Sequence, residues 1–146
     1  MRAWLGLCLL LGGCFQDTSP QRSAFLPLGY RTAFLTVRQC RQNAAHSNNY
    51  QRVLANAVAA DPYTAQSFPL PAGSVVVAEQ HQEPSCSSLI GFYLMAKENL
   101  GYDTANHDWH WQVLDVNERV SQDGRLAACA SCHALSPCRD YLCAPP

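Results

Sequence analysis

The run Cys129-Ala130-Ser131-Cys132-His133 near the end of the chain constrains the fold more than any other stretch. Two cysteines separated by two residues, with a histidine directly after the second, form the attachment signature of a c-type haem. Each thiol adds to one vinyl group of the porphyrin, and the imidazole that follows can then coordinate the iron. The motif predicts one covalent haem c on Cys129 and Cys132, with His133 as the axial iron ligand.

The same residues fit two other interpretations. A zinc ion could be held by the four cysteines of a CxxC…C…C array, with His133 as a spare ligand; these cysteines are Cys129, Cys132, Cys138 and Cys143. A plain disulfide between Cys129 and Cys132 is the third interpretation. The start of the chain favours haem, because haem c is attached outside the cytoplasm and the chain opens on an export signal.

Residues 1–13 read as that signal. A positively charged start is followed by an apolar run over residues 5–11, which is too short to span a bilayer. The run ends in Leu11-Gly12-Gly13-Cys14, which resembles a bacterial lipobox; an ordinary secretory signal cut nearby is the alternative. We expect an exported, periplasmic protein that is anchored to the outer membrane through a lipid on Cys14, because Phe15 rather than aspartate follows that cysteine.

The chain that remains suits a single domain. Of 146 residues, 13 leave with the signal, so 133 remain. Residues 14–23 are polar and are expected to form a tether, and residues 24–146 the haem domain. Without Arg2 the chain has 9 basic and 11 acidic residues, a net charge near −2. This balance indicates no nucleic-acid partner, and it argues against an electron carrier that docks through one strongly charged patch. A redox partner and a homodimer stay open.

Cysteine counting predicts two disulfides. Of the eight cysteines, one leaves with the signal, one takes lipid and two take haem. The remaining four allow three pairings in an oxidising compartment. Cys138 and Cys143 flank a short turn, so a local pair is the simplest choice, and it leaves Cys40 with Cys86. That second bridge would stabilise the fold by about 4 kcal/mol on the chain-entropy model.

The hydrophobic pattern predicts an α+β domain with a small antiparallel sheet and short helices. The clearest strand follows Gly73, where three valines stand in a row, and the apolar run over 89–96 is its natural antiparallel partner. Residues 25–37 could be a strand or a helix. The strands are expected over 50–55, 74–80, 89–96 and 109–116.

Helices and loops follow from the capping and breaking residues. Asn56 is expected to cap a short helix over 57–60, which Pro62 would end. A last helix over 125–134 carries the CxxCH motif. Loops or turns are expected over 38–49, 82–88 and 97–108.

Five segments in this order resemble the cytochrome P-460 family, with its relative cytochrome c-prime-beta. They are VLAN followed by alanines at 53–60, FPLPAGSVVV at 68–77, GFYLMAKE at 91–98, a tryptophan twelve residues after Lys97 (Trp109), and CASCH followed by Arg139-Asp140. The likeness covers roughly residues 30–142. It implies an antiparallel sheet packed on one face of the haem, the CxxCH helix on the other, and binding of small nitrogen ligands.

The resemblance also marks two departures from the family's hydroxylamine-oxidising enzymes. In them a lysine crosslinked to the porphyrin lies five residues after the glycine that opens the first long strand; here that position is Ala78, after Gly73. A distal glutamate lies four residues before the position of Lys97; here Tyr93 stands there. A methyl group cannot form an amine crosslink, and a phenol with a pKa near 10 is a poor base. Both changes argue against hydroxylamine oxidation.

What is left is an apolar and aromatic distal pocket that includes Val76, Ala78 and Tyr93, with Phe92 or Met95 as a further member. We expect a five-coordinate iron that binds a small gas such as nitric oxide or carbon monoxide. The alternatives are an oxidoreductase of hydroxylamine or nitric oxide that works without the crosslink, and a simple electron carrier.

An electron carrier would need a sixth protein ligand on the iron. The candidates are Met95, which is more often a core residue, and the histidines His46, His81, His107 and His110. The remaining conspicuous side chains have structural explanations. Trp109 and Trp111 suit the core or the haem wall, and Lys97 with Glu98 suits a solvated pair at a strand end.

Overall fold

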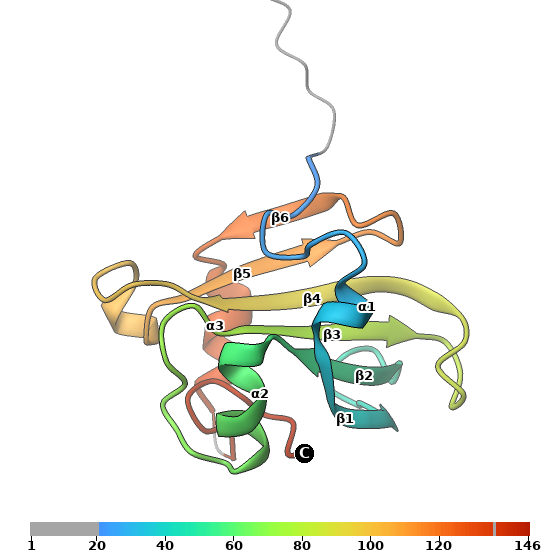
Figure 1. Cartoon of the computed structure of the whole chain (residues 1–146), viewed down its shortest axis with the longest axis horizontal. Helices are drawn as coiled ribbons and strands as arrows, with labels where there is room; N and C mark the ends of the chain where they lie inside the picture. The colour runs from blue at the N-terminus through green and yellow to red at the C-terminus, as the bar shows by residue number, and fades with distance from the viewer. Residues whose placement is uncertain (1–20, 136) are drawn as a thin grey trace, which may run out of the picture.

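The structure, a computed structural model, describes residues 21–135 and 137–146. The expected signal at 1–13, the lipidation site Cys14 and most of the tether at 14–23 lie outside the described residues. At the centre is one antiparallel sheet of six strands in the order β1-β2-β3-β4-β5-β6 (Figure 1). The strands are β1 (Leu35–Gln42), β2 (Tyr50–Ala55), β3 (Val75–His81), β4 (Leu89–Lys97), β5 (Trp109–Leu114) and β6 (Val120–Gly124).

Short helices accompany the sheet. They are α1 (Tyr30–Ala33), α2 (Ala57–Thr64), the 3₁₀ turn η1 (Thr104–Asn106) and α3 (Ala127–His133). An antiparallel sheet with a few short helices confirms the predicted α+β class. In the part of the chain that the structure describes, no helix has the length and apolar character needed to cross a membrane.

The two faces of the sheet carry separate cores, because successive side chains of a strand point to opposite sides. One face, called here the α1 face, packs Leu54, Val77 and Phe92 against Tyr30 of α1. The other, called the α3 face, packs residues of the sheet against α2 and α3; its sheet members include Val53, Val76, Met95 and Trp111. In Figure 1, α1 lies in front of the sheet and α3 behind it.

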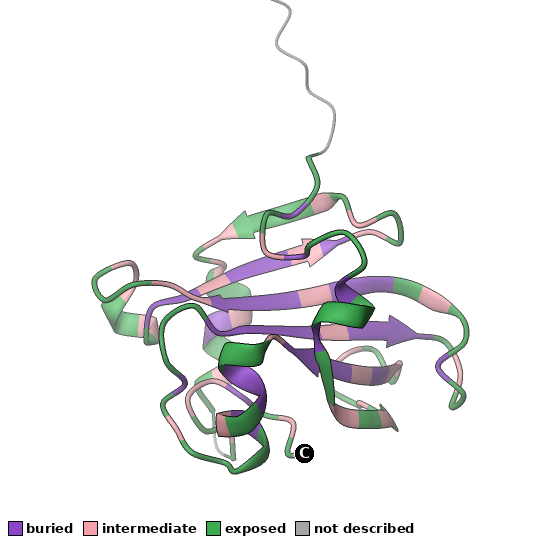
Figure 2. Ribbon diagram, viewed as in Figure 1, coloured by how far each residue is buried: buried purple, intermediate pink, exposed green. Residues whose placement is uncertain are grey.

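Burial on both faces explains the valine run. All residues of β3 except Ala78 are buried, and Figure 2 shows the buried colour along the central strands. A strand that is covered on both sides needs apolar residues at consecutive positions, so its sequence does not alternate. The edge strand β6 has no buried residue.

The predicted loop over 38–49 is wrong in its first part, because β1 extends to Gln42. β1 is an edge strand that pairs only with β2, and its register shifts twice along that pairing. Most of its polar side chains, including Gln39, Arg41 and Gln42, are exposed, which suits an edge that must not pair with other chains. The polar composition that resembles a loop is therefore that of an exposed edge strand.

The prediction that Pro62 ends its helix is also wrong, since α2 continues to Thr64. The Asn56 cap is confirmed, because its Oδ1 accepts hydrogen bonds from the backbone N–H groups of Ala59 and Val75, both at 3.1 Å. Proline lacks the N–H that an interior helical position donates. Packing of Tyr63, which is buried in the α3-face core, holds the last turn in spite of that loss.

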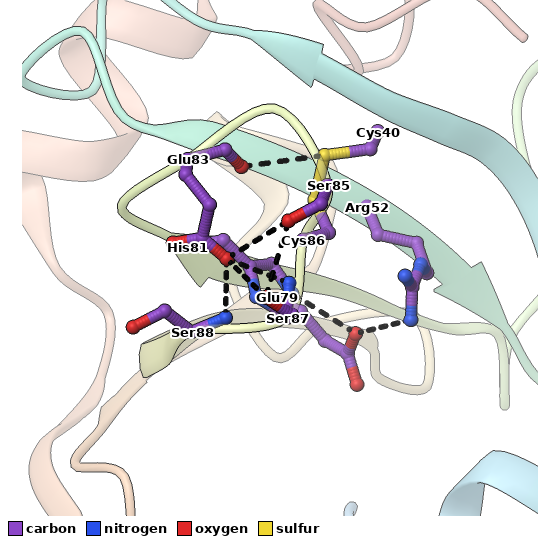
Figure 3. Close-up of a disulfide and its surroundings, with 9 residues drawn as sticks. All are labelled: Cys40, Arg52, Glu79, His81, Glu83, Ser85, Cys86, Ser87 and Ser88. Atoms are coloured by element: carbon purple, nitrogen blue, oxygen red, sulfur yellow. Dashed lines mark hydrogen bonds and ion pairs between the residues drawn. A yellow bond between two sulfur atoms is a disulfide. The ribbon is translucent and has the colours of Figure 1, made fainter.

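A disulfide joins Cys40 of β1 to Cys86 in the loop between β3 and β4, with 6.0 Å between their Cα atoms (Figure 3). Glu83 organises this loop, because one carboxylate oxygen accepts from the backbone N–H groups of Ser87, at 2.8 Å, and Ser88, at 2.5 Å. A second disulfide joins Cys138 to Cys143. Both are the pairs that the sequence favoured.

Candidate functional site

Helix α3 places the two cysteines of the CASCH run on one side. Residues three apart on a helix are neighbours on its surface, so Cys129 and Cys132 face the same way. Both are free thiols. Together with His133 they line a cavity of about 300 Å³ between α3 and the sheet.

The predicted pocket residues reach the same cavity from the opposite side. Val76, Ala78 and Tyr93 all line it, and so does Met95. Ala78 and Tyr93 are direct partners in the antiparallel register of β3 and β4. The cysteines, the histidine and the three predicted pocket residues therefore lie around one space, although 36 positions or more separate the two groups in sequence.

Phe92, the alternative pocket member, lies elsewhere. It is buried in the α1-face core, with its ring centroid 5.8 Å from that of Tyr30. Strand alternation is the reason: Tyr93 and Met95 are two residues apart and share a face, whereas Phe92 points to the other side.

The backbone of the C-terminal loop orients His133. Its Nδ1 lies 2.6 Å from the carbonyl oxygen of Tyr141, so the ring donates its Nδ1–H there and keeps the lone pair of Nε2 free. Burial lowers the pKa of His133, and the Tyr141 carbonyl offsets part of that shift. A neutral imidazole with a fixed tautomer is the form that binds a metal ion.

Asp140 holds that loop against the sheet. Its carboxylate accepts from Lys97 Nζ at 2.7 Å and from the backbone N–H of Leu70 at 2.8 Å. Its carbonyl accepts from Trp109 Nε1 at 2.9 Å. Lys97 is thus not the solvated strand-end residue that the sequence suggested, because its partner is Asp140 rather than Glu98.

The zinc array loses two of its ligands in this arrangement. Cys138 and Cys143 are joined to each other, so they are not thiolates free to bind a metal. Within residues 21–135 and 137–146, no group of three or more His, Cys, Asp or Glu side chains is placed to hold a metal ion.

The cavity also has buried N–H donors without a hydrogen-bond acceptor. Trp111 Nε1 and Gln51 Nε2 are buried, belong to residues that line the cavity, and have no hydrogen-bond partner among the described residues. Arg38, opposite Val53 in the register of β1 and β2, also has unpartnered buried Nε and Nη1 atoms, although it is not among the residues that line the cavity. Buried donors in native proteins are nearly always satisfied. The two carboxylates of a haem would supply acceptors, so the donor set, the thiols and the imidazole together fit that group.

Of the four other histidines, only His46 lines the cavity within the described part of the chain. His81 contacts Glu79 on the α1 face, His107 contacts Asp140, and His110 contacts Glu98 and Asp123. The ring of His46 lies 4.6 Å from that of Tyr93 and 6.1 Å from that of His133, centroid to centroid. Burial, with His133 nearby, lowers the pKa of His46.

Two contributors to the site were not anticipated from the sequence. Gln51 reaches the cavity because it shares a strand face with Val53 on β2. Tyr141 contributes a backbone carbonyl, and the pattern of side chains in a sequence does not predict a backbone contact of this kind.

Comparison with known proteins identifies a family. The family model described as Cytochrome P460 matches residues 27–143, a range that takes in all six strands, α3 and both disulfides. A search of curated proteins finds no match. The family match confirms the resemblance drawn from the five sequence segments.

Proposed function

This chain belongs to the cytochrome P460 family, which is haem-binding, and we propose that it holds one covalent haem c and binds a small gas such as nitric oxide or carbon monoxide. The observation that carries the proposal is the convergence on one cavity of two free thiols, an oriented imidazole and the predicted pocket residues.

Each residue of the site has a role in this proposal. The Cys129 and Cys132 thiols would form the two thioether links. His133 would present Nε2 to the iron, and the Tyr141 carbonyl keeps that imidazole in one tautomer and orientation. When bound, the haem would supply an iron that can accept a small ligand.

The lining of the cavity supports binding more than turnover. Among its described lining residues there is no aspartate, glutamate or lysine. Ala78 and Tyr93 occupy the two positions where the family resemblance implies a crosslinking lysine and a distal glutamate. Without a carboxylate to take up protons, hydroxylamine oxidation loses the base that it would need.

We also propose that the protein is exported to the periplasm and anchored to the outer membrane through Cys14. Two disulfides support this location, because such bridges persist in oxidising compartments.

A denaturing gel stained for haem peroxidase activity tests the covalent attachment. The wild-type band should stain, and Cys129→Ala with Cys132→Ala should abolish the stain. The matched control is Cys138→Ala with Cys143→Ala, which also removes two cysteines but leaves the CASCH run intact and should keep the stain. Stoichiometric zinc without haem would contradict the proposal.

Absorption spectra of the ferrous protein with and without carbon monoxide test ligand binding. Carbon monoxide should change the spectrum with a one-to-one stoichiometry. A ferrous spectrum that carbon monoxide leaves unchanged would favour the electron carrier, and rapid conversion of hydroxylamine would favour the oxidoreductase.

A further inference from the structure

His46 lies at the tip of the loop that joins β1 to β2, and this loop is internally braced. The backbone N–H of Asn43 donates to the carbonyl of Asn49 at 2.8 Å, and the N–H of Asn49 donates to the carbonyl of His46 at 3.1 Å. The side chain of Asn43 accepts from the N–H of Ala45 at 3.0 Å. The backbone of the loop therefore has a defined shape, and with it the place from which the His46 side chain starts.

His46 differs from the other histidines in what its ring nitrogens contact. Each of the other four has a carboxylate or carbonyl oxygen within hydrogen-bond distance of a ring nitrogen. In the described part of the chain, neither ring nitrogen of His46 has such a partner. An imidazole that faces a cavity with both nitrogens unengaged has a lone pair to offer to a ligand of that cavity.

The spacing between the two imidazoles of the cavity suits a shared metal ion. His133 comes from α3 and His46 from the β1–β2 loop, and their ring centroids are 6.1 Å apart. Two imidazoles that bind one metal ion on opposite sides, each with a metal–nitrogen bond of about 2 Å, have centroids roughly 6 Å apart. Imidazoles that face each other with a further ligand between them would be more widely separated.

Met95 is the competing side chain in the same cavity. It belongs to the α3-face core and lies in the middle of β4, where neighbouring strands fix its backbone on both sides. His46 instead lies on the loop between β1 and β2, outside the strand pairing. Its ring can therefore rotate toward the iron or away from it without breaking a hydrogen bond of the sheet, whereas displacing Met95 would disturb a core side chain.

We propose that His46 is the second axial ligand of the haem iron in the resting protein, and that a small ligand binds by displacing it. One iron–imidazole bond is lost and one iron–ligand bond is formed, and the oxidation state of the iron does not change. The inference rests on the proposed function and refines it, because a loop imidazole closes the site that the sequence led us to expect open.

Absorption and electron paramagnetic resonance spectra of the purified haem protein, recorded without added ligand, test the coordination. The wild type should be six-coordinate and low-spin, and His46→Ala should be high-spin. The matched control is His107→Ala, which removes a histidine that does not line the cavity and should retain the wild-type spectra. Met95→Leu is not a control but the test of the competing ligand, because the low-spin spectrum survives in it only if Met95 does not bind the iron.

The kinetics of carbon monoxide binding to the ferrous protein test the displacement. In the wild type the observed rate should level off at high carbon monoxide, because loss of the His46 bond becomes limiting. In His46→Ala the rate should rise linearly and exceed the wild-type plateau at least tenfold.

Three results would overturn the inference: a high-spin wild type, a low-spin spectrum that survives in His46→Ala, or a low-spin spectrum that is lost in Met95→Leu instead. Failure of the proposed function looks different. No variant would then carry covalent haem, or His46→Ala would carry haem and still bind no carbon monoxide.

Discussion

Lys97 and Asp140 form a buried ion pair between the end of β4 and the C-terminal loop, with side chains 9 % and 2 % exposed. The ammonium group also lies 4.6 Å from the centroid of the Trp109 ring. Asp140 and Tyr141 both have positive φ angles, 47° and 65°, which non-glycine residues adopt only when their surroundings impose them. The pair therefore fixes the strained segment whose Tyr141 carbonyl orients His133.

Asp140→Ala should destabilise the protein by about 3–5 kcal/mol, because Lys97 would remain buried without its partner. Urea unfolding followed by circular dichroism measures this. His107→Ala removes the other side chain that contacts the Asp140 carboxylate, an imidazole that is 58 % exposed, and should cost no more than about 1 kcal/mol. Equal effects of the two variants would show that the Lys97–Asp140 pair contributes no more to stability than the exposed contact with His107.

The protein should lose stability on acidification through Glu79, which is fully buried on the α1 face. Burial alone would raise its pKa, but hydrogen bonds from Tyr30 at 2.5 Å and Arg31 at 2.8 Å outweigh this, and the pKa is lowered. A lowered pKa in the folded state means that the stabilisation is present above about pH 4.3, the ordinary value. It is lost as the pH falls through the folded-state pKa.

Urea midpoints between pH 3 and pH 7 measure that contribution. In Glu79→Gln the midpoint should be lower at pH 7 and should fall less on acidification than in the wild type. Parallel curves for the two proteins would mean that Glu79 is not the group responsible.

The two disulfides should differ in their contribution to stability. Replacing Cys40 and Cys86 with alanine removes a bridge that spans 46 residues. On the chain-entropy model this should lower the free energy of unfolding by about 4 kcal/mol. Removing Cys138–Cys143, which spans 5, should cost about 2 kcal/mol. Peptide mapping without reduction first establishes the pairing, and any peptide that links Cys40 to Cys138 or Cys143 would contradict it.

Ala78→Lys combined with Tyr93→Glu should be the change most able to create a crosslink to the haem and raise hydroxylamine oxidation. The two positions are register partners that line the cavity, so the amine and the carboxylate would enter it side by side. Mass spectrometry should find the wild-type haem joined by two thioethers alone, and a third link in the double variant. Rapid hydroxylamine turnover by the wild type would show that these positions matter less than proposed.

The sequence predicts the interior of this fold better than its edges. The strands β2, β3, β4 and β5 and the Asn56 cap are found where local signals placed them, because burial there demands apolar residues and the cap needs only its own turn. The edge strands β1 and β6 are polar, and nothing but their pairing with a neighbour makes them strands. Tyr63 carries α2 past Pro62 by a tertiary contact that helix propensity does not contain.

The site shows the same division. Val76, Ala78 and Tyr93 share a face with one another because alternation and antiparallel pairing put them there, and alternation alone separates Phe92 from them. The partners of Lys97 and His133 lie in the C-terminal loop, and no local pattern announces such contacts. In the sequence, His46 is one of four histidines outside the CASCH run, and no local pattern distinguishes it from the other three.

All six strands of the sheet precede helix α3 in the sequence, and α3 is the segment that would hold the haem. The sheet is complete at Gly124, before α3 begins, and α3 is seven residues long with no side-chain hydrogen bond at its N-cap. So short a helix depends on its packing partners. In hydrogen-exchange experiments on protein without haem, the amides of α3 should therefore open as a local unit, long before those of β3 and β4. Before haem is attached, the sheet would already be folded, while α3 with its two thiols would still open locally.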